Sequence, residues 1–114
     1  MPVIRIDTNA LVEKAREKVV LADLSQLAAS LLGKPEDYVM VHLHAGQTML
    51  FAGTDGPLAY VELKSIGLKS ADCAELSKAL SAFLQERLGI EPSRIYIEFT
   101  AAAGSMWGWN GATF

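Results

Sequence analysis

Residues 20–33, VLADLSQLAASLLG, predict an amphipathic helix that ends at a glycine. The apolar residues that recur here at helical spacing are Val20, Leu24, Leu27, Ala28 and Leu31. Positions i, i+4, i+7 and i+8 trace one face of a helix, so this face is expected to pack on a core. Gly33 suits a left-handed C-cap, because glycine adopts that conformation without a steric penalty.

Nearly the same pattern returns in the second half of the chain and ends at Gly89; its apolar members are Leu76, Leu80, Phe83, Leu84 and Leu88. Segments rich in β-branched or aromatic residues and bounded by proline or glycine flank both patterns, which is typical of strands. These segments are Pro2–Ile6, Pro35–Val41, Pro57–Leu63 and Pro92–Ile97. The chain therefore reads as β-α-β twice, with pseudo-repeats of roughly residues 1–56 and 57–114 in a single domain.

The repeat predicts an α+β fold. A strand–helix–strand unit implies parallel strands joined by a right-handed crossover. Two units can form one four-stranded mixed sheet with both helices on one face. The other face is then bare, and if it is apolar it needs cover, for which oligomerisation is the obvious source. Outside the repeats, Gln47–Phe51 is expected as a short edge strand, and the aromatic tail Trp107–Phe114 as the lining of a pocket or of a subunit contact.

Composition limits the function classes. The 114 residues suit one domain. The net charge of −3 without a basic cluster gives no support for nucleic-acid binding. No apolar run approaches the ~20 residues of a membrane span, and the first residues do not resemble a secretory signal. With Cys73 as its one cysteine the chain has no internal disulfide. We expect a cytoplasmic protein without nucleic-acid or membrane partners.

Six short motifs, in this order along the chain, resemble the macrophage migration inhibitory factor branch of the tautomerase superfamily. They are Pro2, Thr8-Asn9, Gly33-Lys34-Pro35, Ser65-Ile66-Gly67, Arg94-Ile95-Tyr96-Ile97 and Trp109-Asn110-Gly111-Ala112-Thr113-Phe114. The resemblance covers essentially the whole length. It implies a homotrimer whose sheets line a central barrel, with active sites between subunits and no cofactor or metal. It also implies keto–enol tautomerisation of 2-oxo acids such as phenylpyruvate.

Within this resemblance Pro2 has a chemical role. A proline directly after Met1 can be no more than the start of a strand, since proline lacks a backbone N–H. If Met1 is removed, however, Pro2 carries a free secondary amine. Burial in an apolar pocket and a nearby cation, for which Lys34 is the candidate, both lower the pKa of such an amine. A base whose pKa lies near the working pH is the most effective proton shuttle.

The resemblance assigns roles to further residues. Pro2 is the general base, and Lys34 holds the substrate carboxylate. The backbone N–H of Ile66 assists, with Ser65 beside it. The residues expected to form an aromatic, water-excluding pocket are Tyr96 from the adjacent subunit, Trp107, Trp109 and Phe114.

Glu98 departs from the family, which usually has asparagine at this position. An ionised Glu98 stabilises the prolyl ammonium and repels a substrate carboxylate, whereas a neutral Glu98 donates a hydrogen bond as asparagine does. We therefore expect tautomerase activity that is weaker or redirected toward another substrate.

Two other functions stay open. One is a cytokine-like binding role, which requires export without a signal peptide. The other is a related reaction of the same amine, such as hydration or dehalogenation of an unsaturated acid. His42 and His44 share one side of a strand but lack an evident third ligand, so no metal site is expected. Leu58 and Val61 stand where some animal relatives have a Cys-x-x-Cys pair, which leaves no residues for thiol–disulfide exchange.

Overall fold

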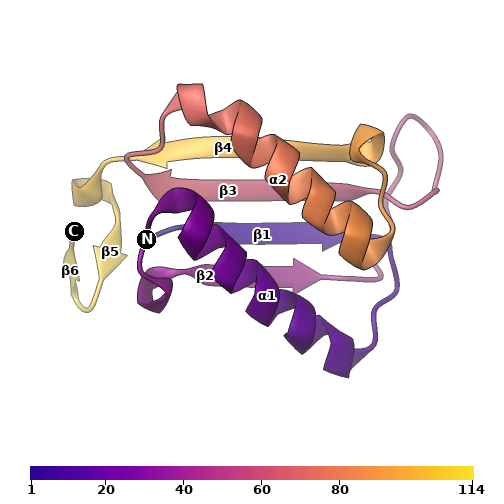
Figure 1. The fold of residues 1–114 in the computed structure, drawn as a ribbon, viewed down its shortest axis with the longest axis horizontal. Helices are drawn as coiled ribbons and strands as arrows, with labels where there is room; N and C mark the ends of the chain where they lie inside the picture. The colour runs from indigo at the N-terminus through magenta and orange to yellow at the C-terminus, as the bar shows by residue number, and fades with distance from the viewer.

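A computed structural model describes residues 1–114 as two helices packed on one face of a sheet (Figure 1). The strands and helices are β1 (Val3–Thr8), α1 (Lys14–Leu32), β2 (Met40–His44), β3 (Ala59–Ile66), α2 (Ser70–Leu88), β4 (Ile95–Ala102), β5 (Gly108–Trp109) and β6 (Ala112–Thr113). No helix is both long and apolar enough to cross a membrane.

The main sheet has the strand order β2-β1-β3-β4. Strand β1 runs parallel to β2, and β3 runs parallel to β4, each pair being joined through its helix. The two units meet where β1 and β3 pair antiparallel. The predicted pair of β-α-β units and their mixed four-stranded sheet are thus confirmed.

Both helices bury the faces that the sequence predicted. Val20, Leu24 and Ala28 of α1 are buried, as are Leu76, Leu80 and Leu84 of α2. They pack on alternate strand residues, among them Ile4, Ile6, Val61 and Leu63. Each helix ends at its predicted glycine in the left-handed conformation, with φ of 61° at Gly33 and 68° at Gly89.

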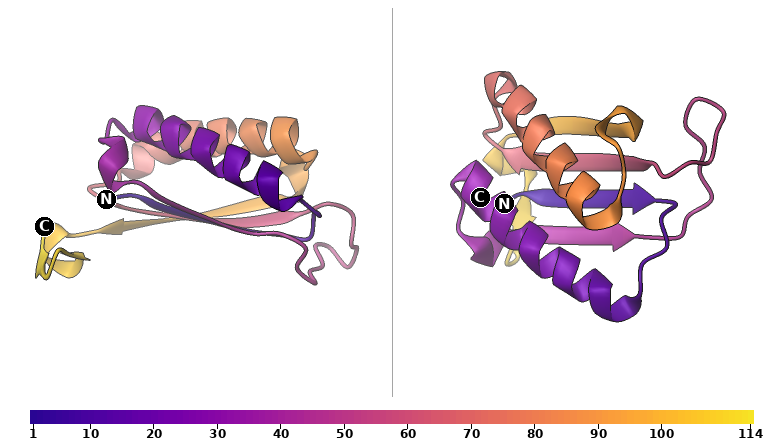
Figure 2. Two further views of the ribbon diagram at one scale, coloured as in Figure 1. Left: turned by 90° about the horizontal axis from the view of Figure 1, so that it is seen from below. Right: turned by 45° about the vertical axis from the view of Figure 1, so that its right-hand side comes forward.

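No helix covers the other face of the sheet (Figure 2, left), and charged side chains of β1 and β3 pair across it. Arg5 pairs with Asp7 at 3.0 Å and with Glu62 at 3.4 Å. Glu62 also pairs with Lys64, and Asp7 with His44. The bare face that the repeat predicts is present but is not mainly apolar, because the strands alternate and send most of their apolar residues to the helix side. The middle of this face is charged, and its exposed apolar residues, Met40 and Tyr96, lie toward its two ends.

Exposed apolar side chains lie instead at the two ends of the sheet. Leu50 and Tyr96, 69% and 66% exposed, are at the end from which the long loop after β2 projects. Met106 and Trp109 are exposed at the opposite end, where the hairpin β5–β6 extends beyond the sheet (Figure 1). The predicted strand at Gln47–Phe51 is wrong: only Phe51 pairs, in an isolated bridge to Thr54 across a tight turn.

Candidate active site

Pro2 lies buried where β1 begins, at the end of the sheet that carries the tail. Its carbonyl accepts a hydrogen bond from the backbone N–H of Met40 at 3.0 Å. The missing N–H of proline costs nothing at a strand's first position. The chain therefore fixes its N-terminus at the end of a central strand. Two hollows lie at this end of the sheet.

The first hollow, of about 280 Å³, lies between the C-terminal end of α1 and the N-terminal end of α2 and includes Lys34, Ser65 and Ile66. The Gly33 cap directs Lys34 there, and its Nζ donates to the carbonyl of Ile66 at 3.4 Å. Lys34 forms no ion pair, although Asp72 lines the same hollow. Its charge is thus not neutralised by a carboxylate of its own chain.

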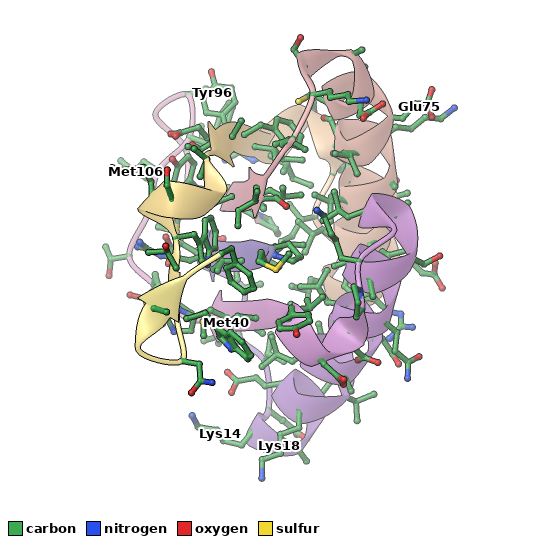
Figure 3. The ribbon with its side chains drawn as sticks, turned by 90° about the vertical axis from the view of Figure 1, so that its left-hand side faces the viewer. Lys14, Lys18, Met40, Glu75, Tyr96 and Met106 are labelled. Carbon is green, nitrogen blue, oxygen red and sulfur yellow. The ribbon has the colours of Figure 1, made fainter.

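The second hollow, of about 220 Å³, is largely apolar and aromatic and contains the side chain of Met1. Its aromatic members are Tyr38, Trp107, Trp109 and Phe114. The rings of Trp109 and Phe114 stack 5.4 Å apart, and Tyr38 meets both with its edge. Figure 3 faces this end of the molecule, where Met40 and Met106 lie around the tail hairpin.

The electrostatics of the N-terminus favour a neutral amine. Burial lowers the pKa of the Met1 amino group, and the nearby charge of Lys34 lowers this pKa further. Both effects disfavour the ammonium form. The fold therefore brings an amine with a lowered pKa, an unpaired cation and an aromatic hollow to one place.

Tyr96 and Glu98 are not part of this assembly within one chain. Through the strand register, Tyr96 lies level with Asp7, five residues from the level of Pro2, or about 17 Å along the strands. Two strand spacings of about 4.8 Å separate β1 from β4 in addition. Tyr96 and Glu98 can border a substrate beside Pro2 only if a second copy supplies them.

Glu98 is held as a hydrogen-bond acceptor on the uncovered face. Its carboxylate accepts from the hydroxyl of Tyr60 at 2.9 Å and from that of Thr100 at 3.2 Å. The bond to Glu98 is the main cause that raises the pKa of Tyr60, so the phenol keeps its proton. With two hydroxyl donors directed at it, Glu98 acts here as an acceptor and not as the hydrogen-bond donor considered from sequence.

Comparison with known proteins identifies the family. The sequence model described as "Macrophage migration inhibitory factor (MIF)" matches residues 1–114. The chain belongs to the macrophage migration inhibitory factor family. It is 38% identical to macrophage migration inhibitory factor of Mus musculus, covering 100% of this chain and 99% of that protein. It is 39% identical to a homolog from Trichuris trichiura, with both proteins covered completely.

Comparison with a solved structure supports the same family. The crystal structure of a macrophage migration inhibitory factor homologue from Prochlorococcus marinus superposes with a TM-score of 0.91. It is 41% identical and covers 98% of each chain. The resemblance drawn from the six motifs is thereby confirmed, and the fold is that of the macrophage migration inhibitory factor family.

Sequence reasoning missed Tyr38, which contacts two of the tail aromatics in this family member. Tyr38 ends a short 3-10 turn after Pro35, directly before β2. Its sequence context is that of an ordinary turn residue, and only the position of the tail makes it part of the hollow. The two histidines of β2 do lie together, edge to face with ring centres 4.1 Å apart, and His44 bonds to Asp7.

Proposed function

We propose that the chain is a keto–enol tautomerase of 2-oxo acids such as phenylpyruvate, and that Pro2 acts as its base after removal of Met1. The observation that carries this proposal is the N-terminal amine, whose pKa is lowered by burial and by Lys34. Once Met1 is gone, the same two causes act on the secondary amine of Pro2. Removal of Met1 also takes away one of the residues that line the aromatic hollow.

The residues support a simple proton transfer. The neutral Pro2 nitrogen takes a proton from the carbon next to the keto group, and the electron pair forms the C=C bond of the enol. The proton is then delivered to the oxygen that was the carbonyl, and the reverse sequence returns the keto form. Lys34 binds the carboxylate beside Ser65 and the Ile66 backbone, and the aromatic hollow accepts the ring. No cofactor is needed for this chemistry.

A site between copies explains the distance of Tyr96 and Glu98 from Pro2. Exposed apolar residues lie at opposite ends of the sheet: Leu50 and Tyr96 at one, Met106 and Trp109 at the other. Two different surfaces that fit one another form head-to-tail contacts, which close into a ring when the rotation permits. We therefore propose a ring of copies with sites at each contact; the number three is taken from the family.

A cytokine-like binding role is the second candidate. The observation that favours it is the 38% identity to the mouse protein named macrophage migration inhibitory factor. For this chain it requires export from the cell, whereas the tautomerase is compatible with a cytoplasmic protein. Hydration or dehalogenation stays a third candidate, in which Glu98 of a neighbouring copy would be the additional polar group.

The test is phenylpyruvate tautomerisation combined with intact-mass analysis. Protein without Met1 is expected to be active, and protein that retains Met1, prepared with methionine aminopeptidase inhibited, to lose at least about 100-fold, as expected for loss of a general base. Equal activity of the two forms would contradict Pro2 as the base. No activity in either form would contradict the tautomerase.

A further inference from the structure

We propose that Arg94 and Phe51 are positioning residues that fix the ring of Tyr96 for presentation to the site of a neighbouring subunit. The inference rests on the proposed tautomerase, in which Tyr96 borders the substrate. It concerns the end of the sheet opposite Pro2, where the long loop between β2 and β3 returns toward the sheet (Figure 1).

Arg94 holds this loop through backbone carbonyls. Its Nε donates to the carbonyl of Pro57 at 3.1 Å, and one Nη donates to those of Phe51, Thr54 and Gly56 at 3.3, 3.1 and 3.1 Å. The guanidinium has five N–H donors in a fixed plane, and no carboxylate competes for it here. The clamp ties residues 51–57 to the beginning of β4.

The clamped turn has an unfavourable backbone. Ala52 has φ of 52°, followed by Gly53 at 76°, between the bridged residues Phe51 and Thr54. A non-glycine residue in the left-handed region persists only where the surrounding structure fixes it, and such residues gather at functional sites. Asn9 adds a second anchor, since its side-chain amide donates to the carbonyl of Asp55 at 2.8 Å and its Oδ1 accepts from Leu58 N–H at 3.0 Å.

The clamp places one aromatic ring against another. The guanidinium carbon of Arg94 lies 5.4 Å from the centre of the Phe51 ring, within range of a cation–π contact. The Phe51 ring lies in turn 4.7 Å from the ring of Tyr96. Phe51 is the one aromatic partner of Tyr96 in the chain, and Tyr96 is otherwise 66% exposed. Figure 3 shows the hydroxyl end of Tyr96 pointing outward.

This arrangement has a kinetic consequence. A ring that is already fixed loses little rotamer freedom when a substrate packs against it, so fixing Tyr96 favours binding. Tyr96 borders the substrate ring and does not touch the atoms that exchange the proton. Loss of Phe51 or Arg94 should therefore raise KM and leave kcat nearly unchanged.

The experiment compares Phe51→Leu and Arg94→Gln with Phe83→Leu in the Met1-free protein. Phe83 is a matched control, because its ring lies 5.2 Å from the guanidinium carbon of Arg87 on α2. Phe51→Leu is expected to raise KM for phenylpyruvate about three- to tenfold, the range of one aromatic pair. Its kcat should change less than about twofold. Phe51→Tyr should restore the KM, and the control should leave it unchanged.

A double-mutant cycle with Tyr96→Ala separates positioning from a general structural effect. If Phe51 acts through Tyr96, Phe51→Leu has no further effect on KM once Tyr96 is alanine. The inference would be overturned if the effects of the two substitutions on KM were additive, or if Phe51→Leu left KM unchanged. A changed sedimentation coefficient of Phe51→Leu would also overturn it, because Phe51 would then act in subunit contact. If the wild-type protein without Met1 were inactive, the proposed tautomerase function would fail. That result is distinguishable from failure of the positioning role, which requires an active wild-type protein.

Discussion

The two ends of the sheet differ in how they hold their aromatic residues. At the end of Pro2, the aromatics gather around a hollow, next to an amine and a cation without an acid partner. At the end of Tyr96, no hollow forms around the ring; Tyr96 contacts Phe51 at a tilted angle, and Arg94 packs on Phe51. In the proposed tautomerase, the first end would receive the substrate and the second end would present Tyr96 to it.

In the proposed tautomerase, this difference would divide one site between two copies of the chain. The register separates Pro2 from Tyr96 by about 17 Å along the strands, so neither half is complete alone. The polar face between them is satisfied by its own ion pairs. Contacts between copies are therefore expected to involve the ends of the sheet more than its uncovered face.

The largest effect is expected at the amine end, for Lys34→Met. Loss of a charge-assisted bond to the substrate carboxylate should lower kcat/KM about 10- to 100-fold. Because Lys34 disfavours the ammonium form, its loss raises the pKa of the Pro2 amine, and the ascending limb of the pH–rate profile should move to higher pH. Lys78→Met, at an exposed position of α2, is the control. If the ascending limb of the pH–rate profile does not move, Lys34 does not lower the pKa of the Pro2 amine.

An intermediate effect on activity is expected when copies with a defective amine end are mixed with copies that lack Tyr96. Lys34→Met and Tyr96→Ala proteins are denatured together, refolded and assayed at low phenylpyruvate. Head-to-tail sites formed by two copies should give roughly a quarter of wild-type activity, since one contact in about four pairs an intact amine end with an intact Tyr96 end. Sites confined to one copy would give only the mean of the two separate variants, and the comparison of the ends would fail.

The smallest effect is expected for Glu98→Gln, at the end of Tyr96. Removing one negative charge should lower KM for the anionic phenylpyruvate by no more than about fivefold, the range of exposed charge pairs. Tyr60 should also titrate at lower pH, because Glu98 is the main cause of its raised pKa. Ultraviolet titration measures the second effect, and Glu91→Gln is the control for the first. If the variant is no faster than wild type at any pH, Glu98 does not face the substrate.

Local pattern made much of the fold predictable. Helical periodicity predicted both buried faces, and two glycines predicted both helix ends. The polarity of the uncovered face was also present in the sequence, since Arg5, Glu62 and Lys64 alternate with apolar residues in their strands. Gln47–Phe51 was mistaken for a strand because its composition says nothing about a partner, which it lacks except at Phe51.

The sequence by itself determined the two β-α-β units, the family and the residue types of the proposed site, because these depend on short-range spacing and on motifs. Only the tertiary structure decided that Tyr38 joins the aromatic hollow, that Arg94 fixes Phe51 against Tyr96, and that Tyr96 lies far from Pro2. These relations depend on strand register and on contacts between residues distant in the chain. Such contacts are favourable only in the packed fold, and they produce no periodic pattern in the sequence from which they could be predicted.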